Sequence, residues 1–284
     1  MDQPAVDALV ALLDLEPLEE DIFRGMSPDE DRQRVFGGQV AGQALVAAAR
    51  TVDEHVVHSL HSYFLRPGDP TVPIVYLVDR IRDGRSFATR RVRAVQHGRP
   101  IFHLSASFQR PEEGFDHQFE APTGLPEPDS LPDFHTRMEP FKDQIGAFYH
   151  RPRPIDLRYC EVSPWARTEP MPPRQHVWIR ANGHLPDDPL VHLCVLTYAS
   201  DLSVLDTSLL PHGESFAVGE VFMASLDHAM WFHRPFRADQ WLLYSQDSPS
   251  ASGGRGLGRG LVFDQDGVLV ASVVQEGLIR HARD

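Results

Sequence analysis

The chain has 284 residues, of which 42% are hydrophobic and 24% are charged, so it is long enough for one large or two medium domains. Its formal net charge is −13, which opposes binding to nucleic acid and to anionic membrane surfaces. We see no apolar run approaching the ~18 residues of a membrane span, and therefore expect no membrane insertion.

Cysteine usage and the chain ends favour a cytoplasmic protein. The two cysteines, Cys160 and Cys194, are too few for a disulfide framework and have no CxxC spacing. The N-terminus lacks the basic and apolar regions of a secretory signal. The last three residues, Ala282-Arg283-Asp284, differ from a Ser-Lys-Leu peroxisomal address, so we expect a cytoplasmic location.

The first elements in the chain are a helix and a series of strands. Residues 37–52 begin with two glycines and continue into an alanine-rich stretch, which predicts one mostly buried helix. Alternating apolar and polar residues then predict four strands. The His97-Gly98 step is a tight hairpin signal, so the last two strands pair antiparallel. The predicted strands span residues 56–64, 74–80, 86–95 and 99–109.

A proline-rich and charge-rich segment follows, at residues 111–152. Prolines at this density exclude a central strand or a long helix. We interpret the segment as a linker between an N-terminal domain, residues 1–110, and a C-terminal domain, residues 153–284. In the second domain we expect the helix near residues 189–210 and a hairpin tip at Asp266-Gly267.

The two domains are copies of one repeat. The sequence offset is 166 residues between Ser59 and Ser225 and 169 residues between Gly98 and Gly267, so an insertion of a few residues relates the copies. The matched pairs in chain order are Ser59-Leu60-His61 with Ser225-Leu226-Asp227-His228, Arg66-Pro67 with Arg234-Pro235, and Gly84-Arg85 with Gly254-Arg255.

Long stretches of both copies resemble the acyl-CoA thioesterase II family, which includes TesB-like enzymes. The stretches are 35–44 and 61–68 in the first copy, and 225–233, 266–272 and 275–277 in the second. The resemblance implies an α+β double hotdog, in which two antiparallel sheets each wrap one central helix and join into a pseudo-dimer with a continuous sheet. It also implies an acyl-CoA substrate, and we expect a homodimer or tetramer.

The resemblance assigns three catalytic residues, Asp201, Ser225 and Gln275. Hydrolysis of a thioester needs an activated water and a donor for the oxygen that gains charge. We expect Asp201 to orient or deprotonate the water, the other two to hold it, and a helix N-terminal amide to polarise the carbonyl. Attack by Asp201 itself, through an anhydride, is the less favoured variant. Position 275 corresponds to about Ala106 in the first copy, which indicates a division of labour.

Each of these residues also has a structural interpretation. An Asp near a helix start is commonly an N-cap, a strand Ser is usually structural, and a Gln on a final strand usually faces solvent. In the Asp227-His228 pair, adjacent strand residues point to opposite faces, so we expect one of them to bridge elements through a buried hydrogen bond.

The glycine- and arginine-rich stretch 253–260 has two interpretations. Gly254, Arg255, Gly256 and Arg259 could admit the pantetheine arm and pair a CoA phosphate, or the glycines could mark a bend in a curved sheet. We expect no metal site, because His55, His58 and His61 are spaced by three on a strand and so alternate faces, with no cysteine nearby. We also expect hydrolysis to need no organic cofactor. A non-catalytic acyl-CoA binding protein, a 2-enoyl-CoA hydratase and an assembly scaffold stay open as alternatives.

Overall fold

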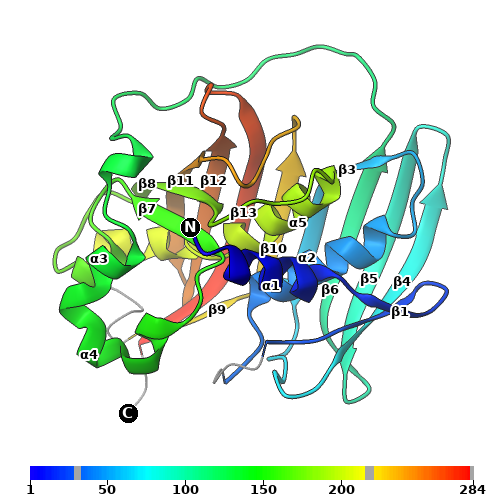
Figure 1. Ribbon diagram of the computed structural model, residues 1–284, viewed down its shortest axis with the longest axis horizontal. Coiled ribbons are helices and arrows are strands. Elements are labelled where there is room, and N and C mark those ends of the chain that lie inside the picture. Colours follow the sequence, from blue (N-terminus) through cyan, green and yellow to red (C-terminus); the bar gives the residue numbers. More distant parts are fainter. Residues whose placement is uncertain (29–32, 215–220, 282–284) are drawn as a thin grey trace.

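The computed structural model describes residues 1–28, 33–214 and 221–281. The C-terminal tripeptide 282–284, used above for the expected location, lies outside the described residues. Within them, the strands form one 13-stranded sheet in the order β1-β2-β4-β5-β6-β3-β10-β13-β12-β11-β8-β7, with β9 also paired to β13 (Figure 1). Every pairing is antiparallel. The predicted continuous sheet is thus present.

The N-terminal copy contributes the half of the sheet on the right in Figure 1. The strands predicted at 56–64 and 99–109 have these bounds, the other two are longer or shifted by one residue, and the helix ends at Ala49 rather than 52. The elements are α1 (Gln3–Leu13), β1 (Glu16–Glu19), β2 (Ile22–Gly25), α2 (Gly37–Ala49), β3 (Val56–Phe64), β4 (Ile74–Asp83), β5 (Phe87–Gln96) and β6 (Arg99–Gln109).

The proline-rich segment crosses from one copy to the other as an extended chain and then forms only short helical turns (Figure 1). This agrees with the expectation that its prolines exclude longer elements. The turns are η1 (Pro128–Ser130), α3 (Phe134–Met138), η2 (Glu139–Phe141), α4 (Lys142–Ile145) and η3 (Gly146–His150).

The C-terminal copy repeats the arrangement, with one difference from the prediction. Its helix ends at Ser200, and two 3-10 turns follow in place of helix up to 210. Ser203 is held out of helical geometry because Gln246 Nε2 donates to its hydroxyl at 2.7 Å and Gln175 Nε2 to its carbonyl at 3.3 Å. The elements are β7 (Ile155–Tyr159), η4 (Pro164–Ala166), β8 (Arg174–Ala181), α5 (Pro189–Ser200), η5 (Val204–Ser208), η6 (Leu210–His212), β9 (Val221–Ser225), β10 (Asp227–Phe232), β11 (Leu242–Ser252), β12 (Arg255–Phe263) and β13 (Leu269–His281).

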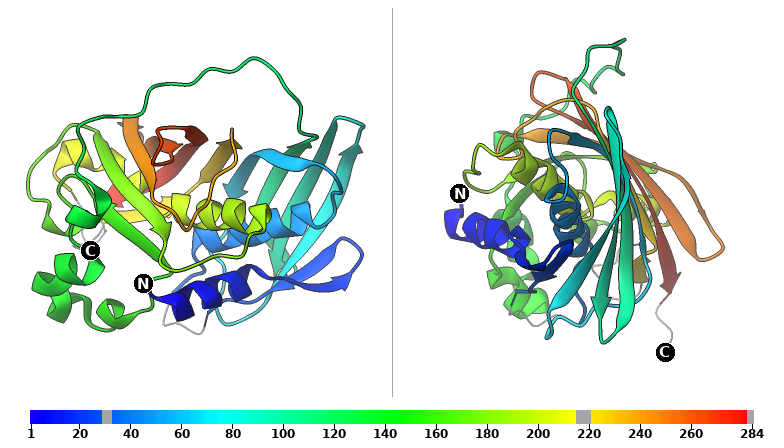
Figure 2. Two further views of the ribbon diagram at one scale, coloured as in Figure 1. Left: turned by 45° about the horizontal axis from the view of Figure 1, so that its top comes forward. Right: turned by 90° about the vertical axis from the view of Figure 1, so that its right-hand side faces the viewer.

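The two central helices, α2 and α5, lie side by side against one face of the curved sheet (Figure 2). Strands β3 and β10 pair across the boundary between the copies, with Ser62 opposite His228. One apolar core is continuous through both copies. The fold therefore behaves as one body in which the two helices share a core.

The stretch Pro189–His212 is long and apolar enough to cross a membrane by length and composition, which the sequence analysis did not anticipate. In the fold, 89% of its most apolar window is buried inside the protein. Its apolar character is what a central helix covered by a sheet requires.

Candidate active site

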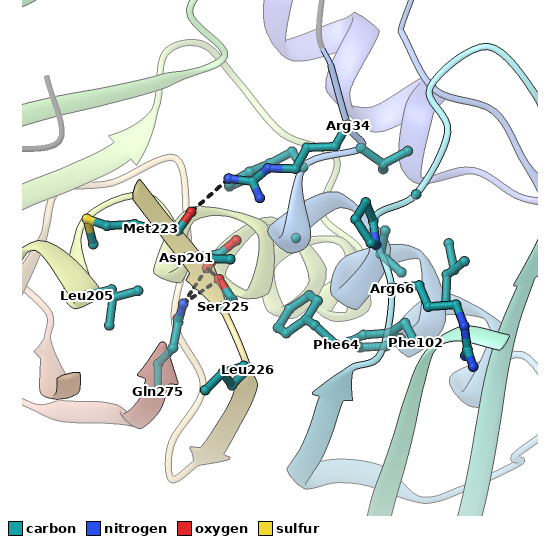
Figure 3. A pocket seen from close by; sticks show the side chains of 18 of the residues that line it. Arg34, Phe64, Arg66, Phe102, Asp201, Leu205, Met223, Ser225, Leu226 and Gln275 are labelled. Atoms are coloured by element: carbon teal, nitrogen blue, oxygen red, sulfur yellow. Dashed lines mark hydrogen bonds between the residues drawn. The ribbon is translucent and has the colours of Figure 1, made fainter. Parts of the chain in front are cut away.

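A cavity of about 620 Å³ opens between the two copies, and we call it the site cavity. Its walls come from the start of α2 and the loop after β3 in the first copy, and from the end of α5, η5, β9 and β13 in the second (Figure 3). It brings together the three residues that the sequence analysis assigned to catalysis, which are Asp201, Ser225 and Gln275.

Asp201 is the C-cap of α5, with φ −81° and ψ −4°. It therefore lies at the end of a helix, and the N-cap interpretation of this residue is wrong. A carboxylate here gains nothing from its own helix, since the negative end of the helix dipole faces it. Its stabilising interactions come from other elements, namely β10, β13, α2 and β9.

Two glycines let the N-terminus of α2 reach Asp201. A β-carbon on Gly37 would stand 2.7 Å from Asp201 Oδ2, and one on Gly38 would stand 2.4 Å from the Tyr198 carbonyl oxygen. Real side chains are excluded at such distances, so only glycine permits this approach. The Gly38 amide donates a hydrogen bond to the Asp201 carboxylate. The sequence analysis missed this role of the glycine pair, although it placed the pair at the helix start.

Ser225 reaches the cavity because of a β-bulge. Ala229 pairs with Val274 on β13, whereas Ser225 pairs with Gly277, so the register slips by one residue at Leu226. Side chains on a regular strand alternate faces, and the extra residue turns Ser225 to the same inner face as His228. Ser225 Oγ then donates to Asp201 Oδ1 at 3.3 Å.

Gln275 joins the other two residues. Its side-chain Nε2 donates to Asp201 Oδ1 at 2.8 Å and to Ser225 Oγ at 2.8 Å. It is 1% exposed, so the expectation that a Gln on a final strand faces solvent does not hold here. Figure 3 shows the three side chains converging from α5, β9 and β13 on one side of the cavity.

The Asp227-His228 pair divides as expected from strand geometry. His228 is 1% exposed and lies behind Gln275, with its Nδ1 2.7 Å from Gln275 Oε1. Asp227 faces the other side of the sheet, where its Oδ1 accepts a hydrogen bond from the Glu276 amide at 2.8 Å. The geometry confirms that adjacent residues point apart and that His228 bridges elements by buried hydrogen bonds.

Burial controls the charge of this cluster. It raises the pKa of the Asp201 carboxyl, while the charge of His228 and the hydrogen bonds from Gln275, the Gly38 amide and Ser225 act in the opposite direction. Burial lowers the pKa of the His228 imidazole. A carboxyl whose pKa is raised by burial is suited to accept a proton during a reaction, and the donors around it hold it in place.

The four residues predicted to contact substrate lie elsewhere. Gly254 is at the tip of the β11–β12 hairpin with φ +74°, and the other three are on β12. A β-carbon on Gly256 would stand 2.4 Å from Ser208 Oγ, so this glycine makes room for η5. Arg255 pairs with Glu276, and Arg259 with Asp247, both on the surface. None of the four lines the site cavity, and their contact with CoA stays a prediction.

The part of the chain that the structure describes contains no cluster of His, Cys, Asp or Glu side chains able to hold a metal ion. A carboxylate, a hydroxyl and a carboxamide within hydrogen-bonding distance can hold one water and take its proton. The apolar side chains of Phe64 and Phe102 line the same cavity (Figure 3).

Comparison with known proteins identifies the class. Residues 154–278 match the family model described as acyl-CoA thioesterase, and residues 27–109 match that described as acyl-CoA thioesterase N-terminal domain. Acyl-coenzyme A thioesterase 8 of Homo sapiens is 46% identical over 285 residues, covering 96% of this chain and 88% of the relative. The chain belongs to the acyl-CoA thioesterase family.

Solved structures agree with the fold. The crystal structure of acyl-CoA thioesterase II TesB2 from Mycobacterium marinum has a TM-score of 0.80 and 48% identity, covering 96% of this chain and 98% of that one. A protein described as having a hot dog fold, from Alicyclobacillus acidocaldarius, has a TM-score of 0.79 with 97% and 99% coverage. At 19% identity the second likeness shows the fold alone. The predicted double hotdog is confirmed.

Proposed function

We propose that this acyl-CoA thioesterase hydrolyses fatty acyl-CoA to free fatty acid and CoA with a water molecule held by Asp201, Ser225 and Gln275. The observation that carries the proposal is the convergence of the three side chains at 2.8 to 3.3 Å in a cavity with an apolar extension. In this mechanism the water oxygen attacks the thioester carbonyl carbon and its proton passes to Asp201. The C–S bond then breaks, and the proton of Asp201 passes to the CoA thiolate.

The carbonyl oxygen gains charge during attack, and α2 supports it. Gly37 lines the cavity at the first turn of α2, so the positive end of that helix dipole faces the reacting group. The N-terminal copy thus supplies electrostatic stabilisation, and the C-terminal copy supplies the proton acceptor.

The acyl chain has a suitable apolar wall in the N-terminal copy. Phe64 and Phe102 pack with ring centroids 5.0 Å apart (Figure 3), and Val40 and Ile101 also line the cavity. A fatty acyl chain placed there removes apolar surface from water, which stabilises binding by about 25 cal/mol for each Å² buried. The aromatic pair forms one wall of the cavity, and the Phe64 ring lies close to Gly37 and Asp201.

Two arginines of the cavity offer phosphate contacts that the sequence analysis did not select. Arg34 donates to the Met223 carbonyl oxygen at 2.8 Å, and Arg66 donates to the Pro100 carbonyl oxygen at 2.6 Å. Neither forms an ion pair with another of the described residues, whereas Arg255 and Arg259 do. The guanidinium groups of Arg34 and Arg66 are thus the better placed to pair with a CoA phosphate.

The test is release of free CoA thiol from short to long acyl-CoAs by wild type and by Asp201→Ala, Ser225→Ala and Gln275→Ala. The proposed site requires all three substitutions to lower kcat sharply. Binding of acyl-CoA without thiol release by wild type would favour a non-catalytic binding protein, and a 3-hydroxyacyl product without free thiol would favour a hydratase. A cytoplasmic homodimer or tetramer stays a prediction, for which light scattering measures the oligomeric state.

A further inference from the structure

His228 is a buried group that the mechanism above does not use. Its ring nitrogens contact one group each: Nδ1 lies 2.7 Å from Gln275 Oε1, and Nε2 lies 2.9 Å from Ser200 Oγ. Ser200 is the last residue of α5, directly before Asp201, and is fully buried. A chain of hydrogen bonds therefore runs from α5 through β10 to β13 and back to the end of α5.

The carboxamide of Gln275 needs a neighbour that selects its orientation. Its two ends have nearly the same shape, and only hydrogen-bond partners distinguish nitrogen from oxygen. Gln275 Nε2 donates hydrogen bonds to Asp201 Oδ1 and to Ser225 Oγ, each at 2.8 Å. The acceptor end faces His228 Nδ1, which must then carry a hydrogen.

The tautomer of His228 is set in turn by Ser200. A neutral imidazole has one N–H, so a hydrogen on Nδ1 leaves Nε2 as an acceptor. The Ser200 hydroxyl then donates to Nε2 rather than to the Thr197 carbonyl oxygen, which also lies at 2.9 Å. If Ser200 donated to Thr197, the hydrogen would move to Nε2 and Gln275 would turn its oxygen toward Asp201, where two acceptors would repel.

We propose that His228 is a positioning residue that holds the Gln275 carboxamide with its nitrogen toward Asp201 and Ser225, and that Ser200 fixes the imidazole tautomer for this purpose. The inference rests on the proposed hydrolytic role of Gln275. It assigns no contact between His228 and the substrate, because the ring is 1% exposed and lies behind Gln275. Its loss therefore lowers kcat and leaves KM nearly unchanged.

The first experiment compares His228→Leu with His228→Asn by thiol release. Leu fills similar space without a donor, whereas the Asn Nδ2 can occupy the place of Nδ1 and donate to Gln275. We expect His228→Leu to lower kcat by about 10- to 100-fold, the usual loss when a group that orients a reactive residue is removed, with KM within about threefold. His228→Asn should keep most of the activity. His58→Leu is the matched control. His58 lies on β3, the strand that pairs with β10, and its Nε2 is 2.8 Å from Ser107 Oγ.

A double-mutant cycle tests the route through Gln275. In a Gln275→Ala background, His228→Leu should change kcat by less than about twofold, because residues that act through one contact are not additive. The same large loss in both backgrounds, a wild-type kcat for His228→Leu, or a rise in KM alone would overturn the proposal. If the Leu variant does not fold, the activities of His228→Asn and His228→Gln are compared instead. The Gln side chain reaches toward Ser200 and not toward Gln275, so it should lose the activity that Asn keeps. Equal activities of the two variants would overturn the proposal. Full activity of Gln275→Ala would instead refute the hydrolytic site itself.

Discussion

Gly37 and Asp201 belong to different copies of the repeat, yet a β-carbon on Gly37 would stand 2.7 Å from Asp201 Oδ2 and 2.9 Å from the Phe64 ring. The carboxylate is thus placed by a residue that has no side chain. The neighbouring Gly38 amide donates to the same carboxylate. The positive end of α2 and the carboxylate at the end of α5 stabilise each other across the boundary between the copies.

Gly37→Ala should therefore displace Asp201 or open the contact between α2 and α5. A shift of about 1 Å in a reacting group costs on the order of 10²-fold in rate, so we expect a kcat loss of that size. Thiol release measures the loss of kcat, and thermal unfolding measures the loss of stability from an opened contact between α2 and α5. Gly114→Ala is the control, since a β-carbon there meets nothing within 4 Å. Wild-type kcat for Gly37→Ala would show that the close approach has no catalytic role.

Asp201→Asn keeps the shape of the carboxylate but removes its ability to take a proton. Loss of a general base typically lowers the rate by about 10²- to 10⁴-fold, and we expect kcat to fall within this range. KM should change little, because the substituted group faces the water. Asp79→Asn, at a surface ion pair with Arg91, is a matched control that should leave kcat unchanged. A loss confined to KM would contradict the role of Asp201.

Ser225 contributes a hydroxyl, so its loss and its replacement by another hydroxyl should differ. Ser225→Ala removes the donor to Asp201 and should lower kcat on the order of 10²-fold, as for other donors at reacting groups. Ser225→Thr should retain most activity. Both variants are assayed by thiol release with one acyl-CoA. Equal losses for Ala and Thr would indicate that steric fit at the bulge, rather than the hydroxyl, is required.

The pH dependence follows from the raised pKa of Asp201. Only the ionised carboxylate accepts a proton, so activity is present above this pKa and is lost as the pH falls through it. Because burial raises the pKa, the acidic limb of kcat should lie above the ordinary range of an aspartate. Measurement of kcat from acidic to neutral pH locates the limb. The residual activity of Asp201→Asn should lack it, and a limb in the ordinary range would contradict the assignment.

Chain-length preference should change when the aromatic wall of the cavity is opened. Phe64→Ala removes one of two packed rings and lengthens the apolar surface available to the acyl chain. One added methylene in such a pocket is worth about 1–3 kcal/mol, so kcat/KM for long relative to short acyl-CoAs should rise roughly tenfold or more. Phe115→Ala, fully exposed in the linker, is the control. An unchanged ratio would place the acyl chain elsewhere.

Most of the fold could be predicted because the repeat and the strand alternation are local patterns. Strand β3 has the predicted bounds, from Val56 to Phe64. The end of α5 could not be predicted in this way. The stretch stays apolar beyond Ser200, whereas the non-helical backbone of Ser203 coincides with hydrogen bonds from Gln175 on β8 and Gln246 on β11, which are distant in sequence.

The site was predictable where a stretch of sequence resembles a family and unpredictable where function depends on close packing. Gln275 was assigned by resemblance, and its neighbours in space agree with that assignment. Arg255 and Arg259 were selected because glycines flank them, yet two of these glycines, Gly256 and Gly258, make room for η5. A sequence does not show what packs against a glycine. The bulge at Leu226, which turns Ser225 inward, has no signal in the local pattern either.

The pairing of β3 with β10 has a consequence for how the enzyme responds to dilution. Where two separate chains supply the halves of a site, lowering the protein concentration separates them and the rate per chain falls. Here the halves are joined by residues 111–152, so the effective concentration of one half near the other is set by the length of this tether. The fusion also allows position 106 to remain alanine while position 275 is glutamine, an asymmetry that identical subunits cannot have.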